Sequence, residues 1–393
     1  MKPDFDKIID RKKSKSIKWD PEVLGEIFGE EDLLPLWVAD MDFQAPEEVI
    51  EAMKEEVSHG VFGYSKRGYQ YYQSIIQWYE KRFNWKIKRE WLVYTSGVVA
   101  AVNYVLQAFL EKEQGVIIQE PVYYPFKKAI KKNGCRVVNN PLKYHEGSYE
   151  IDFEDFEKKA REPSTKLFIL CSPHNPVGRV WKKEELHRLG EICLANGVLI
   201  FADEIHHDLV YQNGAHQIFA NLDPRFEDHV ITATAPSKTF NLAGLMSAHL
   251  IIKNSSLKRR YKHVLEKNHI GHQSPVSMAA VQAAYGKGEP WLEALLAYLQ
   301  GNIRLIETMV AEKLPKAKFT PPRATYLAWI DLRGYGLSGK ALEEKITKKG
   351  KVALDGGTWF GSGGEGFVRI NFACPRKTLE EALERIIKAI EEE

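Results

Sequence analysis

The sequence predicts an α/β protein with a large domain, built on a mainly parallel central sheet flanked by helices, and a smaller α+β domain. Between residues 91 and 252, short apolar runs alternate with helical stretches, which is typical of a parallel sheet covered on both faces. After about residue 255, long helices dominate and two strand-like runs follow. A chain of 393 residues is also longer than one core usually supports, so we expect two domains.

The composition is that of an ordinary globular protein, with 44% hydrophobic residues, 27% charged residues and a formal net charge of +2. This near-neutral balance argues against nucleic acid or a membrane as a partner. The N-terminus carries no apolar signal sequence, and no apolar run approaches the roughly 18 residues of a membrane-spanning helix. Scattered cysteines favour a reducing cytoplasm and argue against a disulfide framework or a metal site; they are Cys135, Cys171, Cys193 and Cys374.

Residues 1–45 are expected to form an irregular arm that joins the small domain, with the large domain at 46–286 and the small domain at 287–393. The arm ends in Leu36-Trp-Val-Ala-Asp-Met-Asp-Phe43, where two aspartates interrupt an apolar run. Such a run can be an edge strand with acidic turn residues, or a segment that lines a pocket. A helix is predicted over 46–57, because proline suits the first helical turn, and a glycine-rich loop over 60–68 follows.

The remaining elements are predicted from hydrophobic periodicity and from glycine and proline positions. The predicted strands span 91–95, 116–119, 136–139, 166–171, 198–202, 230–234 and 249–252 in the large domain, and 326–331 and 367–372 in the small domain. The predicted helices span 69–83, 98–110, 121–132, 153–160, 183–195, 257–269, 276–285, 291–314 and 379–390.

Residues that follow the strands are the candidates for a site, because ligands of an open parallel sheet bind beyond the carboxyl ends of its strands. Ser96-Gly97 precedes a predicted helix, where exposed amides suit an anion, although many such pairs are only helix caps. Tyr123 lies between two prolines in Pro121-Val-Tyr-Tyr-Pro125. It can be a core residue of a turn or an aromatic plate against a flat ring.

Three further polar residues follow or interrupt apolar strands. Asn175, in Ser172-Pro-His-Asn-Pro-Val-Gly178, belongs to a tight turn, and its amide can also face a ligand oxygen. Asp203 ends a very apolar strand, so its carboxylate needs a cationic partner, unless it is a cap or a metal ligand. Arg369 lies within Gly366-Phe-Val-Arg-Ile-Asn-Phe372, where a guanidinium favours a bidentate anion such as an α-carboxylate.

Lys238 lies in the stretch Ala235-Pro-Ser-Lys-Thr-Phe-Asn-Leu-Ala-Gly244, directly after a predicted strand. Small and hydroxyl neighbours, Ser237 among them, leave room for a bulky group and suit a phosphate. A buried lysine tends to lose its charge and become a nucleophile. On its own, one such lysine does not establish a cofactor site.

The four residues Asn175, Asp203, Lys238 and Arg369 occur in the order and approximate spacing of fold-type I pyridoxal 5′-phosphate (PLP) enzymes, which the chain resembles over nearly its whole length. The resemblance implies the PLP-dependent transferase fold of type I. It is closer to the MalY/PatB branch of cystathionine β-lyases, within the class I/II aminotransferase family. The motifs that carry this closer resemblance are Leu36-Trp-Val-Ala-Asp-Met-Asp-Phe43, Asp203-Glu-Ile-His206, Ser237-Lys-Thr-Phe-Asn241, Trp359-Phe-Gly361 and Gly366-Phe-Val-Arg369.

The resemblance implies a role for each matching residue. Lys238 would bind PLP and act as the catalytic base, Asp203 would keep the pyridine nitrogen protonated, and Arg369 would bind the substrate carboxylate. Tyr64 would reach the partner's site in a homodimer with shared active sites. The expected cofactor-binding residues are Gly97, Val98, Val99, Tyr123, Asn175, Asp203, His206, Ser237, Lys238 and Tyr64, and the expected substrate-binding residues are Arg369, Trp37, Ala39 and Asp40.

The implied activity is α,β-elimination from L-cystathionine, or from a related cysteine S-conjugate or cystine, to a thiol such as homocysteine, pyruvate and ammonia. Two departures from ordinary aminotransferases agree with this branch: His206 stands where many carry tyrosine, and Met246 where many carry a phosphate-binding arginine. Because the same residues serve transamination, a class I/II aminotransferase is an alternative. A regulatory or interaction protein on the same fold is a second alternative.

Overall fold

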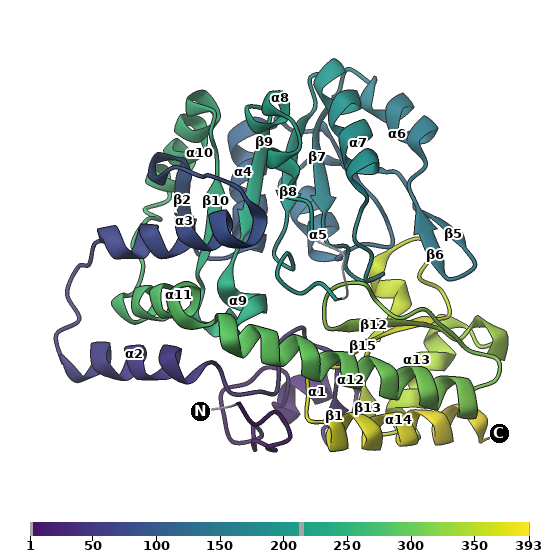
Figure 1. The fold of residues 1–393 in the computed structure, drawn as a ribbon. Coiled ribbons are helices and arrows are strands. Elements are labelled where there is room, and N and C mark those ends of the chain that lie inside the picture. The colour runs from purple at the N-terminus through teal and green to yellow at the C-terminus, as the bar shows by residue number, and fades with distance from the viewer. Residues whose placement is uncertain (1–2, 212–215, 393) are drawn as a thin grey trace.

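A seven-stranded sheet lies at the centre of the computed structural model, which describes residues 3–211 and 216–392. Its strand order is β2-β10-β9-β8-β7-β3-β4 (Figure 1). Six of these strands run in the same direction and β10 runs in the opposite one, so the predicted mainly parallel sheet is confirmed. The strands are β2 (Leu92–Thr95), β3 (Gly115–Ile118), β4 (Arg136–Asn139), β7 (Thr165–Cys171), β8 (Leu199–Asp203), β9 (Val230–Thr234) and β10 (Ala248–Ile251).

Helices cover both faces of this sheet, because alternate residues of each strand point to opposite faces. Leu167 and Ile169 of β7 belong to one core cluster, and Phe168 and Leu170 belong to the other. The first face carries α4 (Val98–Phe109), α5 (Pro125–Lys132) and α10 (Ser255–Lys267). The second carries α3 (Tyr69–Phe83), α6 (Phe153–Ala160), α7 (Lys183–Ala195) and α11 (Pro275–Lys287), and α2 (Glu47–Ser58) packs on α11.

A second, antiparallel sheet of four strands forms the C-terminal part, in the order β11-β12-β15-β14. It lies in the lower half of Figure 1, next to the long helix α12, and α12 packs directly on the terminal helix α14. Its elements are α12 (Glu289–Lys313), β11 (Lys318–Phe319), β12 (Leu327–Asp331), α13 (Gly339–Lys348), β13 (Val352–Ala353), β14 (Asp355–Gly356), β15 (Phe367–Asn371) and α14 (Arg376–Glu391).

The prediction that the N-terminal arm is irregular is wrong, since the arm contains the helix α1 (Pro21–Phe28). Asp20 caps this helix by accepting hydrogen bonds from two backbone amides, and Gly29 ends it with a left-handed φ of 74°. Beyond it, β1 (Leu34–Pro35) pairs in parallel with β13. This pairing places the arm beside the C-terminal elements (Figure 1), and the division into 1–45, 46–286 and 287–393 stays a proposal.

Tertiary hydrogen bonds shorten one predicted helix. The stretch 121–124 precedes α5 instead of belonging to it, because Val122 N donates to Phe360 O and Tyr123 N donates to Asn175 O. The hairpin of β5 (Lys143–His145) and β6 (Ser148–Glu150) and the helix α13 were not predicted. The remaining short helices are α8 (Pro224–Glu227), α9 (Pro236–Thr239), η1 (Arg89–Trp91), η2 (Phe219–Asn221), η3 (Ala243–Leu245), η4 (Arg333–Tyr335) and η5 (Gly357–Phe360). None of the helices in the described ranges is long and apolar enough to cross a membrane.

Candidate active site

Three adjacent strands end side by side at one edge of the central sheet. Cys171, the last residue of β7, pairs with Asp203, the last residue of β8, and Asp203 pairs with Ala233 near the end of β9. The predicted residues Asn175, Asp203 and Lys238 therefore leave the sheet at the same edge. This edge is where open α/β sheets bind their ligands.

Lys238 lies in the short helix α9 and is half-buried. Its Nζ donates a hydrogen bond to the backbone oxygen of Ala39 at 2.5 Å. Burial lowers the pKa of Lys238 to about 8, and the nearby Arg369 acts in the same direction, whereas Asp40 and Asp203 oppose the shift. A lysine with this pKa is partly neutral near neutral pH and can act as a nucleophile or a base.

Asp203 is a buried carboxylate with an incomplete set of partners. Its Oδ1 accepts a hydrogen bond from Ile205 N at 3.1 Å. Burial raises the pKa of Asp203 to about 7, and the charge of Lys238 counteracts this rise. A cationic group placed against the carboxylate would restore its ionised form, and a protonated pyridine nitrogen is such a group.

Arg369 on β15 is buried and engaged at both terminal nitrogens. Nη1 donates to Asn175 Oδ1 at 3.0 Å, and Nη2 donates to Trp37 O at 2.9 Å and forms an ion pair with Asp355. Because Asn175 uses its oxygen on Arg369, its Nδ2 is left as a donor for a ligand. The structure thus brings Asn175, Arg369 and Trp37 together, as predicted.

The end of the N-terminal arm forms one wall of this site. Ala39 O accepts hydrogen bonds from Lys238 and from the hydroxyl of Tyr326. Asp40 does not contact Lys238 directly; its carboxylate pairs with Arg11 at 2.8 Å. Trp37 is buried, and its indole Nε1 donates to a backbone oxygen of the arm, so its backbone oxygen is what reaches the site.

The carboxyl ends of the strands also carry buried polar atoms without hydrogen-bond partners among the described residues. These include Ser172 Oγ after β7, His206 Nδ1 after β8 and Thr234 Oγ1 at the end of β9. Orphaned buried polar atoms are rare in native proteins and indicate an absent ligand or water. The donor set of two hydroxyls beside a lysine and a carboxylate fits PLP.

Gly97 is the N-cap residue of helix α4, at the carboxyl end of β2, and has a φ of 146°. A Cβ built on Gly97 would meet no atom within 4 Å, so the space in front of this helix is open. Val98 is buried and Val99 is 39% exposed, and their backbone amides start the helix. A helix N-terminus of this kind is suited to a phosphate, with the half-buried Ser237 of α9 as a further donor.

Tyr123 and His206 complete the set that the sequence predicts for this edge. Tyr123 is half-buried, and its ring packs edge-on against Phe126 at 5.5 Å. His206 is buried, its ring lies 6.0 Å from that of Tyr326, and burial holds its pKa well below the ordinary value. A neutral imidazole beside a cofactor ring can accept or donate a hydrogen bond without adding charge.

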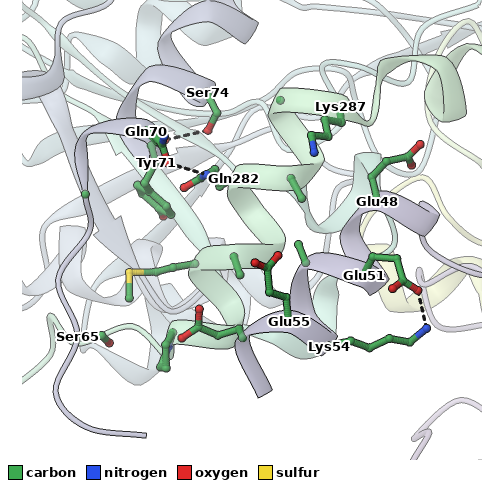
Figure 2. A pocket seen from close by; sticks show the side chains of 18 of the residues that line it. Glu48, Glu51, Lys54, Glu55, Ser65, Gln70, Tyr71, Ser74, Gln282 and Lys287 are labelled. Atoms are coloured by element: carbon green, nitrogen blue, oxygen red, sulfur yellow. Dashed lines mark hydrogen bonds and ion pairs between the residues drawn. The ribbon is translucent and has the colours of Figure 1, made fainter. Parts of the chain in front are cut away.

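Tyr64 is not part of this cluster. It is 100% exposed on the glycine-rich loop, and its ring lies 5.8 Å from that of His272. Next to this loop, α2, α3 and α11 line an open groove of about 1740 Å³ (Figure 2). None of Lys238, Asp203 and Arg369 lines that groove, so it is not the chemical centre.

Three residues of the site were missed from the sequence. Asp355, the ion-pair partner of Arg369, lies in a strand of two residues, which is too short to show a hydrophobic alternation in the sequence. Tyr326 was assigned only to a strand. Asn241 ends the Ser237-Lys-Thr-Phe-Asn241 motif, and its side chain binds the backbone of Met41 and Phe43 in the arm. Of these three residues, only Asn241 could have been identified from the sequence, because it belongs to this motif.

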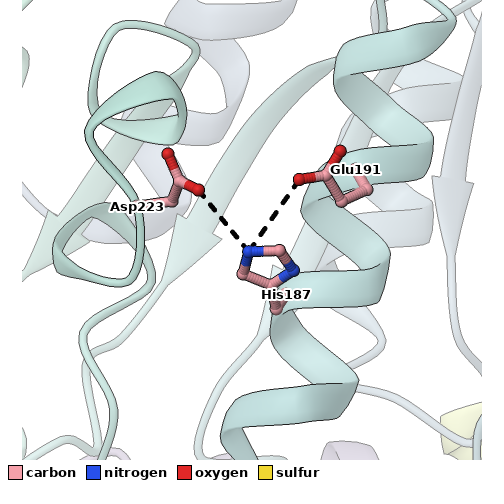
Figure 3. Close-up of side chains that lie close together, drawn as sticks. All are labelled: His187, Glu191 and Asp223. Atoms are coloured by element: carbon pink, nitrogen blue, oxygen red, sulfur yellow. Dashed lines mark ion pairs between the residues drawn. The ribbon is translucent and has the colours of Figure 1, made fainter.

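A possible metal-binding trio of His187, Glu191 and Asp223 lies elsewhere on the surface (Figure 3). His187 Nε2 is 3.8 Å from Glu191 Oε1 and 3.5 Å from Asp223 Oδ2. Arg225, however, pairs with both carboxylates. Both carboxylates are already engaged by this guanidinium, so we assign no metal to them.

The family model described as aminotransferase class I and II matches residues 31–386 of the chain. The chain belongs to this family. Within it, cystathionine β-lyase PatB of Bacillus subtilis is 44% identical over 386 residues, covering 98% of this chain and 99% of PatB. Protein MalY of Escherichia coli is 34% identical over 389 residues, covering 98% of both chains. The predicted resemblance to the MalY/PatB branch of the family is therefore confirmed.

A solved structure of the family supports the same assignment. The PLP-bound C–S lyase from Staphylococcus hominis superposes with a TM-score of 0.93 at 38% identity, covering 100% of this chain and 99% of that chain. The predicted PLP-dependent transferase fold is confirmed by this agreement.

Proposed function

We propose that this family member is a PLP-dependent C–S β-lyase. It cleaves L-cystathionine, or a related cysteine S-conjugate or cystine, by α,β-elimination to a thiol such as homocysteine, pyruvate and ammonia. The observation that carries the proposal is the full-length 44% identity to a protein named cystathionine β-lyase. The convergence of Lys238, Asp203 and Arg369 at one edge of the sheet supports it.

PLP supplies an electron sink that stabilises negative charge at the substrate Cα. Lys238 would bind it covalently, and Asp203 would pair with its ring nitrogen. Asn175 Nδ2 would donate to the ring oxygen, with Tyr123 and His206 as neighbours of the ring. Ser237, Thr234 and the amides at the start of α4, from Gly97, Val98 and Val99, would hold the phosphate.

The chain's own groups orient the substrate and move one proton. Arg369 binds the α-carboxylate, with the backbone of Trp37 and Ala39 and the nearby Asp40 forming the adjacent wall. Lys238 Nζ, released when the substrate's own amine takes its place, would take the proton from Cα, and its pKa is lowered to about 8 by burial. The electron pair of the Cα–H bond would form a Cα–Cβ double bond as sulfur leaves Cβ with the C–S pair, and the departing thiolate takes a proton to become the thiol. Water hydrolyses the released enamine to pyruvate and ammonia.

The active unit is proposed to be a homodimer with shared sites in the cytoplasm. Apolar side chains gather on and beside the glycine-rich loop that carries Tyr64: Val57, Val61, Phe62 and Tyr69 are each more than half exposed. Such a patch is typical of a protein–protein interface. In the dimer, Tyr64 would reach the PLP phosphate of the partner's site.

A class I/II aminotransferase is the second candidate, because the family to which the chain belongs is described as aminotransferase class I and II. Incubation of the PLP-loaded protein with L-cystathionine separates the two. Equal amounts of homocysteine and pyruvate, formed without any added keto acid, support the lyase. Strict dependence on 2-oxoglutarate would refute the lyase in favour of the aminotransferase, and no turnover at all would favour a regulatory protein.

A further inference from the structure

Arg369 shares its guanidinium with a carboxylate of the chain itself. Asp355 lies directly opposite Arg369 in the antiparallel pair of β14 and β15, and its Oδ2 forms an ion pair with Arg369 Nη2. The two side chains are 1% and 3% exposed. The sequence predicts an arginine that awaits an anion, whereas the structure shows an arginine with an anion already beside it.

This ion pair leaves one polar atom unsatisfied on each side. Arg369 Nε and Asp355 Oδ1 are both buried without a hydrogen-bond partner in the described part of the chain. Bidentate arginine–carboxylate pairs satisfy two nitrogens and two oxygens at once, so this pair is not of that strong kind. Burial raises the pKa of Asp355 to about 6, against the opposing effect of Arg369.

A second acidic group lies close to the pair. A Cβ on Gly356 would lie 1.7 Å from Glu343 Oε1, so the glycine next to Asp355 leaves room for the Glu343 carboxylate. Glu343 Oε1 also accepts a hydrogen bond from Thr358 Oγ1 at 3.0 Å, and its charge adds to the raised pKa of Asp355. A second negative charge therefore lies near the Asp355 member of the pair.

We propose that Asp355 competes with the substrate α-carboxylate for Arg369 and thereby sets how tightly the site holds its amino acid. The inference rests on the proposed function, in which Arg369 binds that carboxylate. An entering carboxylate has to share the guanidinium with Asp355, and two like charges at one cation repel each other. Pyruvate keeps the same carboxylate, so the competition also weakens retention of the product.

The test is the affinity for an amino acid that has no leaving group on its β-carbon. Asp355→Asn keeps the shape of the side chain and an oxygen for Arg369, but it removes the charge. The Kd of L-alanine is measured by calorimetry for the PLP-loaded wild type and variant. We expect about tenfold tighter binding to the variant, because the charged competitor is gone.

Two controls isolate the charge at Arg369. L-Alaninamide, which has a neutral amide in place of the carboxylate, should bind the wild type and Asp355→Asn equally. Asp331→Asn removes a carboxylate of the same sheet that pairs with Arg333 instead, and it should leave the Kd of L-alanine unchanged. A general loosening of the fold would not tighten binding of the carboxylate ligand alone.

An unchanged or higher Kd of L-alanine in Asp355→Asn overturns the proposal, because Asp355 then only supports Arg369. If L-alanine binds neither protein while both retain PLP, the amino-acid site of the proposed function fails, and this inference fails with it. If Asp355→Asn does not fold, Asp355→Ser, which removes the same charge with a smaller side chain, gives the same test. No decrease in that variant overturns the proposal as well.

Discussion

Lys238 donates a hydrogen bond from Nζ to the backbone oxygen of Ala39, at 2.5 Å, although 199 residues separate the two in the sequence. Tyr326 donates its hydroxyl to the same oxygen at 2.8 Å. The N-terminal arm is thus a structural part of the lysine's surroundings. Changes in the arm are expected to affect the chemistry of Lys238 and the binding of the substrate.

Loosening the arm should raise KM more than it impairs PLP attachment. Asn241 holds the arm by accepting from Met41 N at 2.9 Å and by donating to Met41 O at 3.0 Å and Phe43 O at 2.8 Å. Asn241→Ala leaves these backbone groups unpaired, at a cost of about 1–3 kcal/mol in the free energy of unfolding. Steady-state kinetics measures KM, the absorbance of the bound cofactor measures PLP attachment, and thermal unfolding measures stability, with the exposed Asn268→Ala as control. An unchanged KM would argue against the arm as a wall of the site.

The rate at which cofactor-free protein binds PLP covalently should rise with pH, with a midpoint near 8. Burial lowers the pKa of Lys238 to about 8, so its amine is protonated and unreactive below this pH and neutral above it. Stopped-flow absorbance of the bound cofactor measures this profile. A midpoint near the ordinary lysine value of about 10.4 would show that the site does not perturb Lys238.

Asp203→Asn should retain bound PLP and lose most of the activity. A neutral amide cannot stabilise a protonated ring nitrogen as the carboxylate does, so kcat should fall by about 100-fold or more. Borohydride reduction followed by peptide mass analysis shows whether PLP is still attached to Lys238. Near-normal kcat in this variant would mean that Asp203 does not face the ring.

Shared active sites can be tested by subunit complementation. Lys238→Ala and Tyr64→Ala impair the same site from different subunits, so a mixed dimer contains one site free of both changes. After unfolding and refolding together, the mixture should regain activity, up to about a quarter of the wild-type value if subunits pair at random. Activity no higher than the mean of the two separate variants would place Tyr64 outside the partner's site.

Much of the central sheet follows from local sequence signals. Helix α3 spans the predicted residues 69–83, and each of the seven strands lies within about one residue of its predicted position. Because parallel strands end at a common edge, the polar residues after them could be assigned to one site before their distances were known. Asn175, Asp203 and Lys238 are all found there.

Pairing between remote segments could not be predicted in this way. Asp355 lies in a two-residue strand, and its position opposite Arg369 depends on the register of β14 with β15. Tyr326 reaches Ala39 only because the arm crosses to the C-terminal part of the chain. Helix α1 is a different case, since its Asp20-Pro21 start and its Gly29 end were visible signals that went unused.

The most direct test of the proposed lyase activity is the fate of L-cystathionine when 2-oxoglutarate is present in excess. A β-lyase should form homocysteine and pyruvate at the rate seen without the keto acid and should accumulate no glutamate, and Lys238→Ala should abolish both products. Glutamate formed in step with cystathionine consumption, without pyruvate, would contradict the proposed lyase activity and identify the protein as an aminotransferase.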